Sequence, residues 1–141
     1  MLGVAVAGEL RRQDCEPVAT ARPGRRGFVG MDIGDWRDVM RTVGEHTPGL
    51  VLHLAAETDV DRCEREPDHA YAVNAFGTEN VARACAELGA TMVYVSTGNV
   101  FDGDKIDPYT EYDAPGSINV YGRSKLEGER IVQQILDEYF I

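Results

Sequence analysis

The chain has 141 residues, of which 43% are hydrophobic, which is enough apolar material for one compact domain with a sizeable core. Its formal net charge of -10 argues against nucleic acid as a general partner, because a polyanion needs clustered Lys and Arg, although a locally basic pocket still suits a small nucleotide. No apolar run approaches the roughly 18 residues of a membrane span and no signal peptide opens the chain, so we expect a cytoplasmic protein without a membrane partner.

Apolar spacing, capping residues and turn residues predict helices and strands that alternate along the chain. We expect helices over 2–13, 35–46, 67–88 and 120–136, strands over 18–21, 50–54 and 91–96, the start of a strand at 139–141, and loops over 25–27, 55–65 and 99–116. Pro67 and Gly89 mark the limits of the long third helix. This alternation specifies an α/β fold with a doubly wound parallel sheet.

The cysteines and histidines do not support a metal site. Cys15, Cys63 and Cys85 are far apart and form no Cys-x-x-Cys motif, so we expect three reduced thiols. His53 lies within an apolar run, where a packed, hydrogen-bonded histidine is more frequent than a metal ligand. We therefore predict no metal.

Thr97, Tyr121 and Lys125 offer a hydroxyl, a phenol and an amine. Positions i and i+4 share one helix face, so the Lys125 ammonium can approach the Tyr121 phenol and favour its phenolate. The apolar runs 50–54 and 92–95 end in small residues, as buried parallel strands do where they open into a ligand crevice. The pattern predicts acid/base work on a carbonyl oxygen beside a hydride donor. The structural alternative is a helix-surface contact.

Five segments, which cover most of the chain, occur in an order known from one protein family. They are HLAAETDVD (53–61), AVNAFGTEN (72–80), VSTGNVFDG (95–103), PYTE (108–111) and NVYGRSKLEGE (119–129). The chain thereby resembles the extended short-chain dehydrogenase/reductases, and among them the dTDP-4-dehydrorhamnose reductases. The resemblance implies that 1–141 is a single, partial NAD(P)-binding Rossmann domain. It would lack the first strand and the carboxyl-terminal substrate domain.

The resemblance also implies roles for individual residues. Tyr121 would give a proton to the substrate keto oxygen, Lys125 would hold the nicotinamide ribose and lower the pKa of the phenol, and Thr97 would hydrogen-bond the reacting oxygen beside Gly98. The implied cofactor-binding positions are Leu2, Gly3, Asp32, Ile33, Ala55, Ala56, Glu57, Thr58, Val95, Tyr121 and Lys125. Asn74 matches a helix asparagine that steadies the strand ends beside the site. A buried amide satisfied by backbone groups is the alternative.

The end of the strand expected over 18–21 bears on the choice of cofactor. In the complete fold of the family this is the second strand, because the first one is absent here. NAD enzymes commonly place Asp or Glu there to bind the ribose 2′-hydroxyl, but this chain has Ala21 and Arg22. Because Arg22, Arg25 and Arg26 favour a 2′-phosphate, we predict NADP(H), with NAD(H) as the alternative. The other interpretation of these arginines is an ordinary solvated loop.

The implied activity is NAD(P)H-dependent reduction of the 4-keto group of a dTDP-4-dehydro-6-deoxy sugar in dTDP-rhamnose synthesis. The partner would be a small nucleotide sugar, and a homodimer is compatible with the resemblance. Gly98 and Asn99 replace the Asp-Tyr that the family usually carries after Ser-Thr, so the substrate is less fixed than the cofactor. A non-catalytic nucleotide-binding regulatory subunit, like that of methionine adenosyltransferase, and a sugar-nucleotide epimerase or dehydratase stay open.

The implied absence of the first strand has a consequence for the sheet. That strand lies at the centre of the usual doubly wound order, so two interior strand edges would be left unpaired. We therefore expect weak or no activity from these 141 residues alone.

Overall fold

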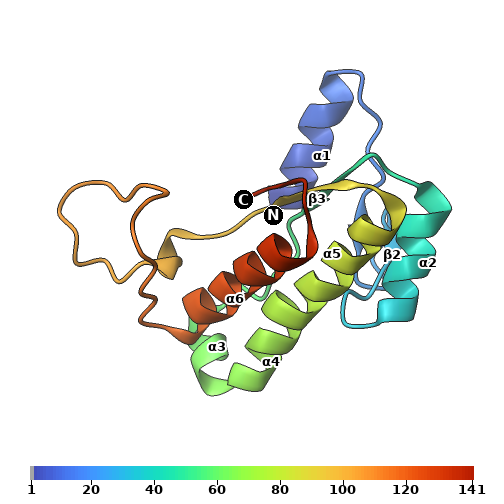
Figure 1. Cartoon of the computed structure of the whole chain (residues 1–141). Coiled ribbons are helices and arrows are strands. Elements are labelled where there is room, and N and C mark those ends of the chain that lie inside the picture. The colour runs from blue at the N-terminus through green and yellow to red at the C-terminus, as the bar shows by residue number, and fades with distance from the viewer. Residues whose placement is uncertain (1) are drawn as a thin grey trace.

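The computed structural model describes residues 2–141 and has the helices and parallel strands of an α/β fold, as predicted (Figure 1). The elements are α1 (Leu2–Arg12), β1 (Thr20–Ala21), β2 (Val29–Gly30), α2 (Trp36–His46), β3 (Leu50–His53), α3 (Val60–Arg65), α4 (Pro67–Tyr71), the π-helix η1 (Ala72–Phe76), α5 (Gly77–Leu88), β4 (Thr91–Tyr94), the 3-10 helix η2 (Gly98–Val100), α6 (Val120–Ile135) and β5 (Tyr139–Phe140). Within 2–141, no helix combines the length and hydropathy that crossing a bilayer requires.

The strands form two parallel sheets. One contains β1 and β2, and the other has the order β3-β4-β5, so β4 is its central strand. Among residues 2–141, β1 pairs only with β2 and β3 pairs only with β4, which agrees with the two unpaired edges expected from the sequence. Since β3 and β4 run parallel, the segments that follow them leave from the same edge of the sheet.

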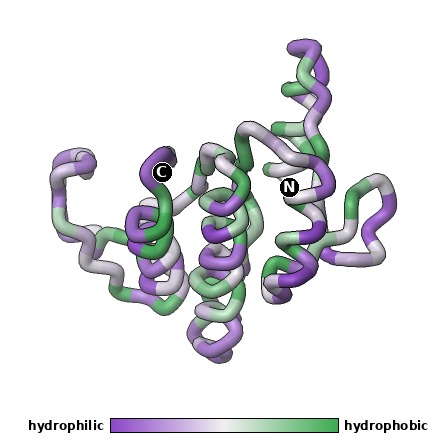
Figure 2. Tube along the Cα trace, turned by 45° about the vertical axis from the view of Figure 1, so that its right-hand side comes forward, coloured by the Kyte–Doolittle hydropathy of each residue, from purple (hydrophilic) through white to green (hydrophobic). Residues whose placement is uncertain are grey.

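Helices α2, α5 and α6 pack around the main core. α5 contacts α2, α6 and the strands β3 and β4, and it lies beside α6 in Figure 1. Each helix carries hydrophobic and hydrophilic residues in turn (Figure 2), so one face can be buried while the other meets solvent. The buried core residues are Val39, Val43, Val81, Ala82, Ala84, Cys85, Ala90, Met92, Tyr94, Val132 and Leu136.

Three local features differ from the sequence prediction. The expected strand over 18–21 is confined to Thr20–Ala21, and Val29–Gly30 forms a strand that was not predicted. The segment Val60–Arg65, expected within a loop, is a helix whose N-cap Asp59 accepts a hydrogen bond from the Arg62 amide at 2.9 Å. A single capped turn is too short to show a helical period, which is why the pattern did not reveal it.

The long helix predicted over 67–88 is present, but it contains a π-helical turn at Ala72–Phe76. It begins at Pro67, and Gly89 follows it with φ 69°, in the left-handed region that glycine favours. Both predicted limits are therefore confirmed. The π turn was not predicted, and such turns occur frequently at functional sites.

Gly128 allows α6 to approach the π turn closely. A Cβ at this position would lie 2.7 Å from the backbone oxygen of Asn74. We expect Gly128→Ala to lower the free energy of unfolding by about 2 kcal/mol, because the backbones must move apart. Gly44, inside α2, has nothing within 4 Å of its ideal Cβ. Gly44→Ala should therefore raise the free energy of unfolding by about 0.5–1 kcal/mol. Urea unfolding followed by circular dichroism measures both, and equal effects would contradict the close approach.

Candidate active site

The predicted site residues follow the carboxyl ends of parallel strands. Arg22 comes directly after β1, Asp32 and Ile33 come shortly after β2, 55–58 follow β3 and 95–98 follow β4. The last two segments start from neighbouring parallel strands, so they lie along one edge of the main sheet. In open α/β sheets this edge is where ligands bind.

Lys125 is buried, with 2% of its surface exposed, and its ammonium is held by the end of β4. Nζ donates a hydrogen bond to the Val95 carbonyl at 2.7 Å and lies 3.9 Å from the centroid of the Tyr94 ring. The Tyr94 hydroxyl donates to the backbone oxygen of Lys125 at 3.1 Å. Burial lowers the pKa of Lys125 to about 8, and the charge of Glu129 acts in the opposite direction.

Thr97 is joined to the start of α6 through Asn99. The Thr97 hydroxyl oxygen accepts hydrogen bonds from the backbone and side-chain nitrogens of Asn99, each at 3.2 Å. The Asn119 side chain, which caps α6, donates to the Asn99 side-chain oxygen at 3.2 Å. The segment 95–99 is therefore tied to α6 at Asn119 and at Lys125, on both sides of Tyr121.

Tyr121 is half-buried beside a small cluster formed by Cys63, Ala70 and Val120. Its backbone oxygen accepts a hydrogen bond from the Ser124 hydroxyl at 2.8 Å. Within residues 2–141, the hydrogen bond of the Lys125 ammonium goes to Val95, and none joins it to the Tyr121 phenol. The structure thus brings together the segments that carry Thr97, Tyr121 and Lys125, while the direct influence of the ammonium on the phenol stays a prediction.

Asn74, in the π turn, links the loop after β3 to α6. Its side-chain oxygen accepts from the Glu57 amide at 2.8 Å, and its side-chain nitrogen donates to the Glu57 carbonyl at 3.1 Å and to the Ser124 hydroxyl at 2.9 Å. Asn74 is fully buried. Two of these three hydrogen bonds go to backbone groups, as the alternative interpretation of the sequence expected. The same two bonds hold the loop after β3, which the resemblance expected Asn74 to steady.

Glu57 was predicted at the cofactor, and in the structure its carboxylate is paired with the neighbouring side chains of Arg62 and His69. Oε2 lies 3.0 Å from the Arg62 guanidinium and 3.3 Å from His69 Nε2, the latter without the alignment of a hydrogen bond. Burial acts to raise the pKa of Glu57, but the Asp59 amide, Arg62 and His69 together outweigh it and lower that pKa. The partnership with Arg62 was not predicted because α3, which carries Arg62, was expected to be a loop.

The remaining predicted cofactor positions are held in different ways. Arg22 and Leu2 are exposed, and the ideal Cβ of Gly3 would lie 3.7 Å from Leu54 Cδ1. Asp32 accepts a hydrogen bond from the Gly34 amide at 2.9 Å, and the Ile33 carbonyl accepts one from the Asn80 side chain at 2.8 Å. Their contacts with a cofactor stay predictions.

His53 is packed and hydrogen-bonded, which confirms the sequence prediction. Its Nε2 lies 3.1 Å from the Thr78 hydroxyl oxygen, which in turn donates to the Asn74 carbonyl at 2.8 Å. The ring stacks on Tyr94 with centroids 5.8 Å apart. Burial lowers the pKa of His53 to about 3, and the nearby Lys125 charge acts in the same direction. Within the described residues, no three His, Cys, Asp or Glu side chains are grouped to hold a metal.

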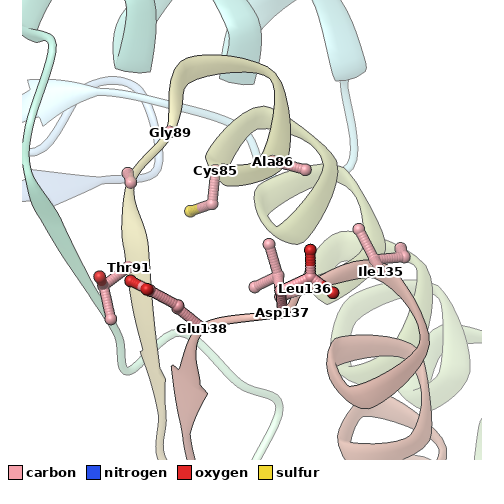
Figure 3. A pocket seen from close by; sticks show the side chains of 9 residues that line it. Cys85, Ala86, Gly89, Thr91, Ile135, Leu136, Asp137 and Glu138 are labelled. Carbon is pink, nitrogen blue, oxygen red and sulfur yellow. The ribbon is translucent and has the colours of Figure 1, made fainter.

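A pocket of about 310 Å³ lies between the end of α5, the start of β4 and the segment after α6 (Figure 3). It is lined by Cys85, Thr91, Leu136 and Glu138, among others, at the amino-terminal end of β4. Thr97 follows the other end of this strand. Burial raises the pKa of the Cys85 thiol to about 11, so the thiol is not poised as a nucleophile. This pocket is separate from the candidate active site.

Comparison with known proteins identifies the family. The model of the RmlD substrate binding domain matches residues 1–141. The chain belongs to this family. A dTDP-4-dehydrorhamnose reductase of Sinorhizobium fredii is 42% identical over 118 residues, which cover 84% of the chain and 38% of the relative. Methionine adenosyltransferase 2 subunit beta of Rattus norvegicus is 35% identical over 133 residues, which cover 94% of the chain and 40% of the relative.

A solved structure supports the same family and the Rossmann-like parallel fold. The dTDP-4-dehydrorhamnose reductase of Bacillus anthracis, in complex with NADP, superimposes with a TM-score of 0.77 at 44% identity. The match covers 79% of this chain and 40% of that one. The chain therefore spans about two-fifths of the length of the relatives it matches.

The buried neutral His53 makes stability depend on pH. Its folded pKa, about 3, lies below the ordinary value of 6.5, so its contribution is complete above pH 6.5 and is lost as the pH falls toward 3. We expect the unfolding free energy to fall by up to about 1.4 kcal/mol per pH unit between about pH 6 and pH 5. His53→Gln should remove this slope. Parallel urea titrations measure the difference, and identical slopes would contradict a neutral His53.

Proposed function

We propose that this chain is the cofactor-binding part of an NAD(P)H-dependent reductase that acts on the 4-keto group of a dTDP-4-dehydro-6-deoxy sugar. The observation that carries the proposal is the double attachment of 95–99 to α6, at Asn119 and at Lys125. This attachment supports a site in which Thr97 and Tyr121 act on the same substrate atom. The name of the Sinorhizobium relative supports the same reaction.

The donors of the chain fit a dinucleotide phosphate. A buried ammonium at the carboxyl end of β4 suits the hydroxyls of the nicotinamide ribose, and this is the position of Lys125. The exposed guanidinium of Arg22, directly after β1, suits a 2′-phosphate. Asp32 and Ile33 would flank the adenine. The Bacillus anthracis relative is in complex with NADP, which supports NADP(H) over NAD(H) here.

The residues of the chain would manage the proton while the bound cofactor supplies the hydride. Tyr121 would donate its phenolic proton to the keto oxygen as that oxygen gains negative charge. Thr97 would hydrogen-bond the same oxygen and fix its position. The positive charge of Lys125 would stabilise the phenolate left on Tyr121. The residues 55–58 and Gly98 would line the cofactor and sugar along the sheet edge.

The proposal also covers the partner of the protein, its location in the cell and its domain organisation. The partner is a nucleotide sugar, the protein is cytoplasmic, and 1–141 forms one partial domain with weak or no activity alone. The homodimer stays a prediction. The similarity to methionine adenosyltransferase 2 subunit beta keeps a regulatory role as the second candidate. The presence of Thr97, Tyr121 and Lys125 favours an enzyme over a regulatory subunit. We favour a reductase over an epimerase or dehydratase, because those two reactions need further acid/base residues.

The role of Tyr121 is tested in a chimaera in which 1–141 replace the matching segment of the Sinorhizobium fredii reductase. We expect Tyr121→Phe to lower kcat by about 10²- to 10⁴-fold, because the proton donor is lost, while the affinity for NADPH stays within about twofold. Tyr112→Phe, at a tyrosine that is 91% exposed, is the control. Loss of NADPH absorbance with the keto sugar nucleotide measures turnover. Full activity of the Tyr121 variant would contradict the proposed reaction.

The role of Arg22 is tested by cofactor preference in the same chimaera. We expect Arg22→Ala to weaken NADPH binding roughly tenfold and to leave NADH binding unchanged, because only the 2′-phosphate loses a partner. Arg37→Ala, which removes the same charge from the exposed surface of α2, is the control. Calorimetric titration with both cofactors measures the ratio. An unchanged NADPH preference would remove the argument for NADP(H).

A further inference from the structure

Two successive residues at the end of β4 bind two successive turns of α6. The Val95 carbonyl accepts the hydrogen bond of Lys125, and the Ser96 hydroxyl donates to Glu129 Oε1. Tyr121, Lys125 and Glu129 are spaced four residues apart, so they lie along one face of the helix. The Ser96 bond therefore fixes a carboxylate one turn beyond the buried ammonium.

A buried ammonium needs more than one hydrogen bond to keep its proton. Removing the charge from water is unfavourable, and an opposite charge nearby offsets part of that cost. The Val95 carbonyl and the Tyr94 ring supply a dipole and a quadrupole, but neither carries a net charge. Glu129 carries a net negative charge, and this charge acts to raise the pKa of Lys125 against the effect of burial.

We propose that Glu129, held by Ser96, is a positioning residue that keeps the Lys125 ammonium charged and directed to the end of β4. It acts through Lys125 and needs no contact with substrate or cofactor. The catalytic consequence rests on the proposed function, because a neutral Lys125 would no longer stabilise the Tyr121 phenolate. The electrostatic role belongs to the chain itself and holds whatever reaction the site performs.

The other titratable groups around Lys125 do not supply this charge. His53 on β3 is buried and its pKa is lowered to about 3, so it is neutral at pH 7. Burial raises the pKa of Tyr94 on β4, so its phenol is neutral as well. Tyr121 lies on the turn of α6 that precedes Lys125. Glu129 is thus the carboxylate whose charge acts on Lys125 in the part of the chain that the structure describes.

The titration of Lys125 tests the inference directly. Lys105 and Lys125 are the lysines of the chain, so ¹³C-lysine NMR of the 141-residue protein gives two signals, which Lys105→Arg assigns. Glu129→Gln keeps the shape of the side chain and an oxygen for Ser96 while it removes the charge. We expect the pKa of Lys125 to fall from about 8 by roughly half a unit to one unit. Ser96→Ala, which releases the carboxylate, should lower it by less.

Glu127→Gln is the matched control. It makes the same change of charge two positions away on α6, at a residue paired with Arg130 at 3.3 Å, and it should leave Lys125 unchanged. Circular dichroism confirms that each variant is folded. An unchanged Lys125 pKa in Glu129→Gln, or an equal fall in Glu127→Gln, would overturn the inference.

A turnover measurement separates this inference from the proposed function. In the chimaera, Glu129→Gln should move the alkaline limb of the kcat profile to lower pH by the same amount as the pKa of Lys125. A fall in the Lys125 pKa without any turnover in the unsubstituted chimaera would overturn the reductase proposal and support the role of Glu129. A limb that does not move, although the Lys125 pKa falls, would overturn its catalytic consequence.

Discussion

The burial of the Lys125 ammonium is the constraint on which the rest of the site depends. An unpaired buried charge would cost more than most single contacts contribute, so the surrounding chain must supply partners. β4 supplies them from consecutive residues, the Tyr94 ring and the Val95 carbonyl. The Tyr94 hydroxyl also binds the backbone of Lys125, and Gly128 leaves room for this close approach. These contacts hold α6 close to the end of β4.

A second junction completes the arrangement from the side of β3. Asn74 reaches both the Glu57 backbone and Ser124, so the loop after β3 and α6 are bound to the same amide. The π turn that carries Asn74 also leaves its carbonyl to Thr78, which partners His53. Neutral polar groups thus connect the loop after β3 to α6, and such networks fix a geometry because every unmade bond in them costs free energy.

The parts of the fold that follow from local pattern were predictable. The helix α2 begins after an Asp that accepts hydrogen bonds from its first amides, and the strands β3 and β4 coincide with apolar runs. The strand β2 escaped prediction because two residues show no alternation. The π turn was not predicted either, and nothing in the sequence around Asn74 indicates that its side chain will bind Ser124, fifty positions later.

The candidate site residues could be proposed from residue types and spacing, but their contacts could not. The spacing of Tyr121 and Lys125 places both on one face of α6, yet the direction of the Lys125 side chain was decided by Val95 and Tyr94, which belong to another element. Helical periodicity states which residues share a face and carries no information about the strand that this face meets. The same reason hid the attachment of Glu129 to Ser96.

Asn99 shows why a departure from a family pattern should be interpreted in three dimensions. In sequence, Gly98 and Asn99 amount to the loss of a carboxylate and a phenol that would face the sugar. In the structure, the Asn99 amide donates to Thr97 and accepts from Asn119. The Asn99 side chain has both a donor and an acceptor, so it binds Thr97 and Asn119 at the same time. The residue that departs from the family pattern therefore attaches Thr97 to the start of α6 in this chain.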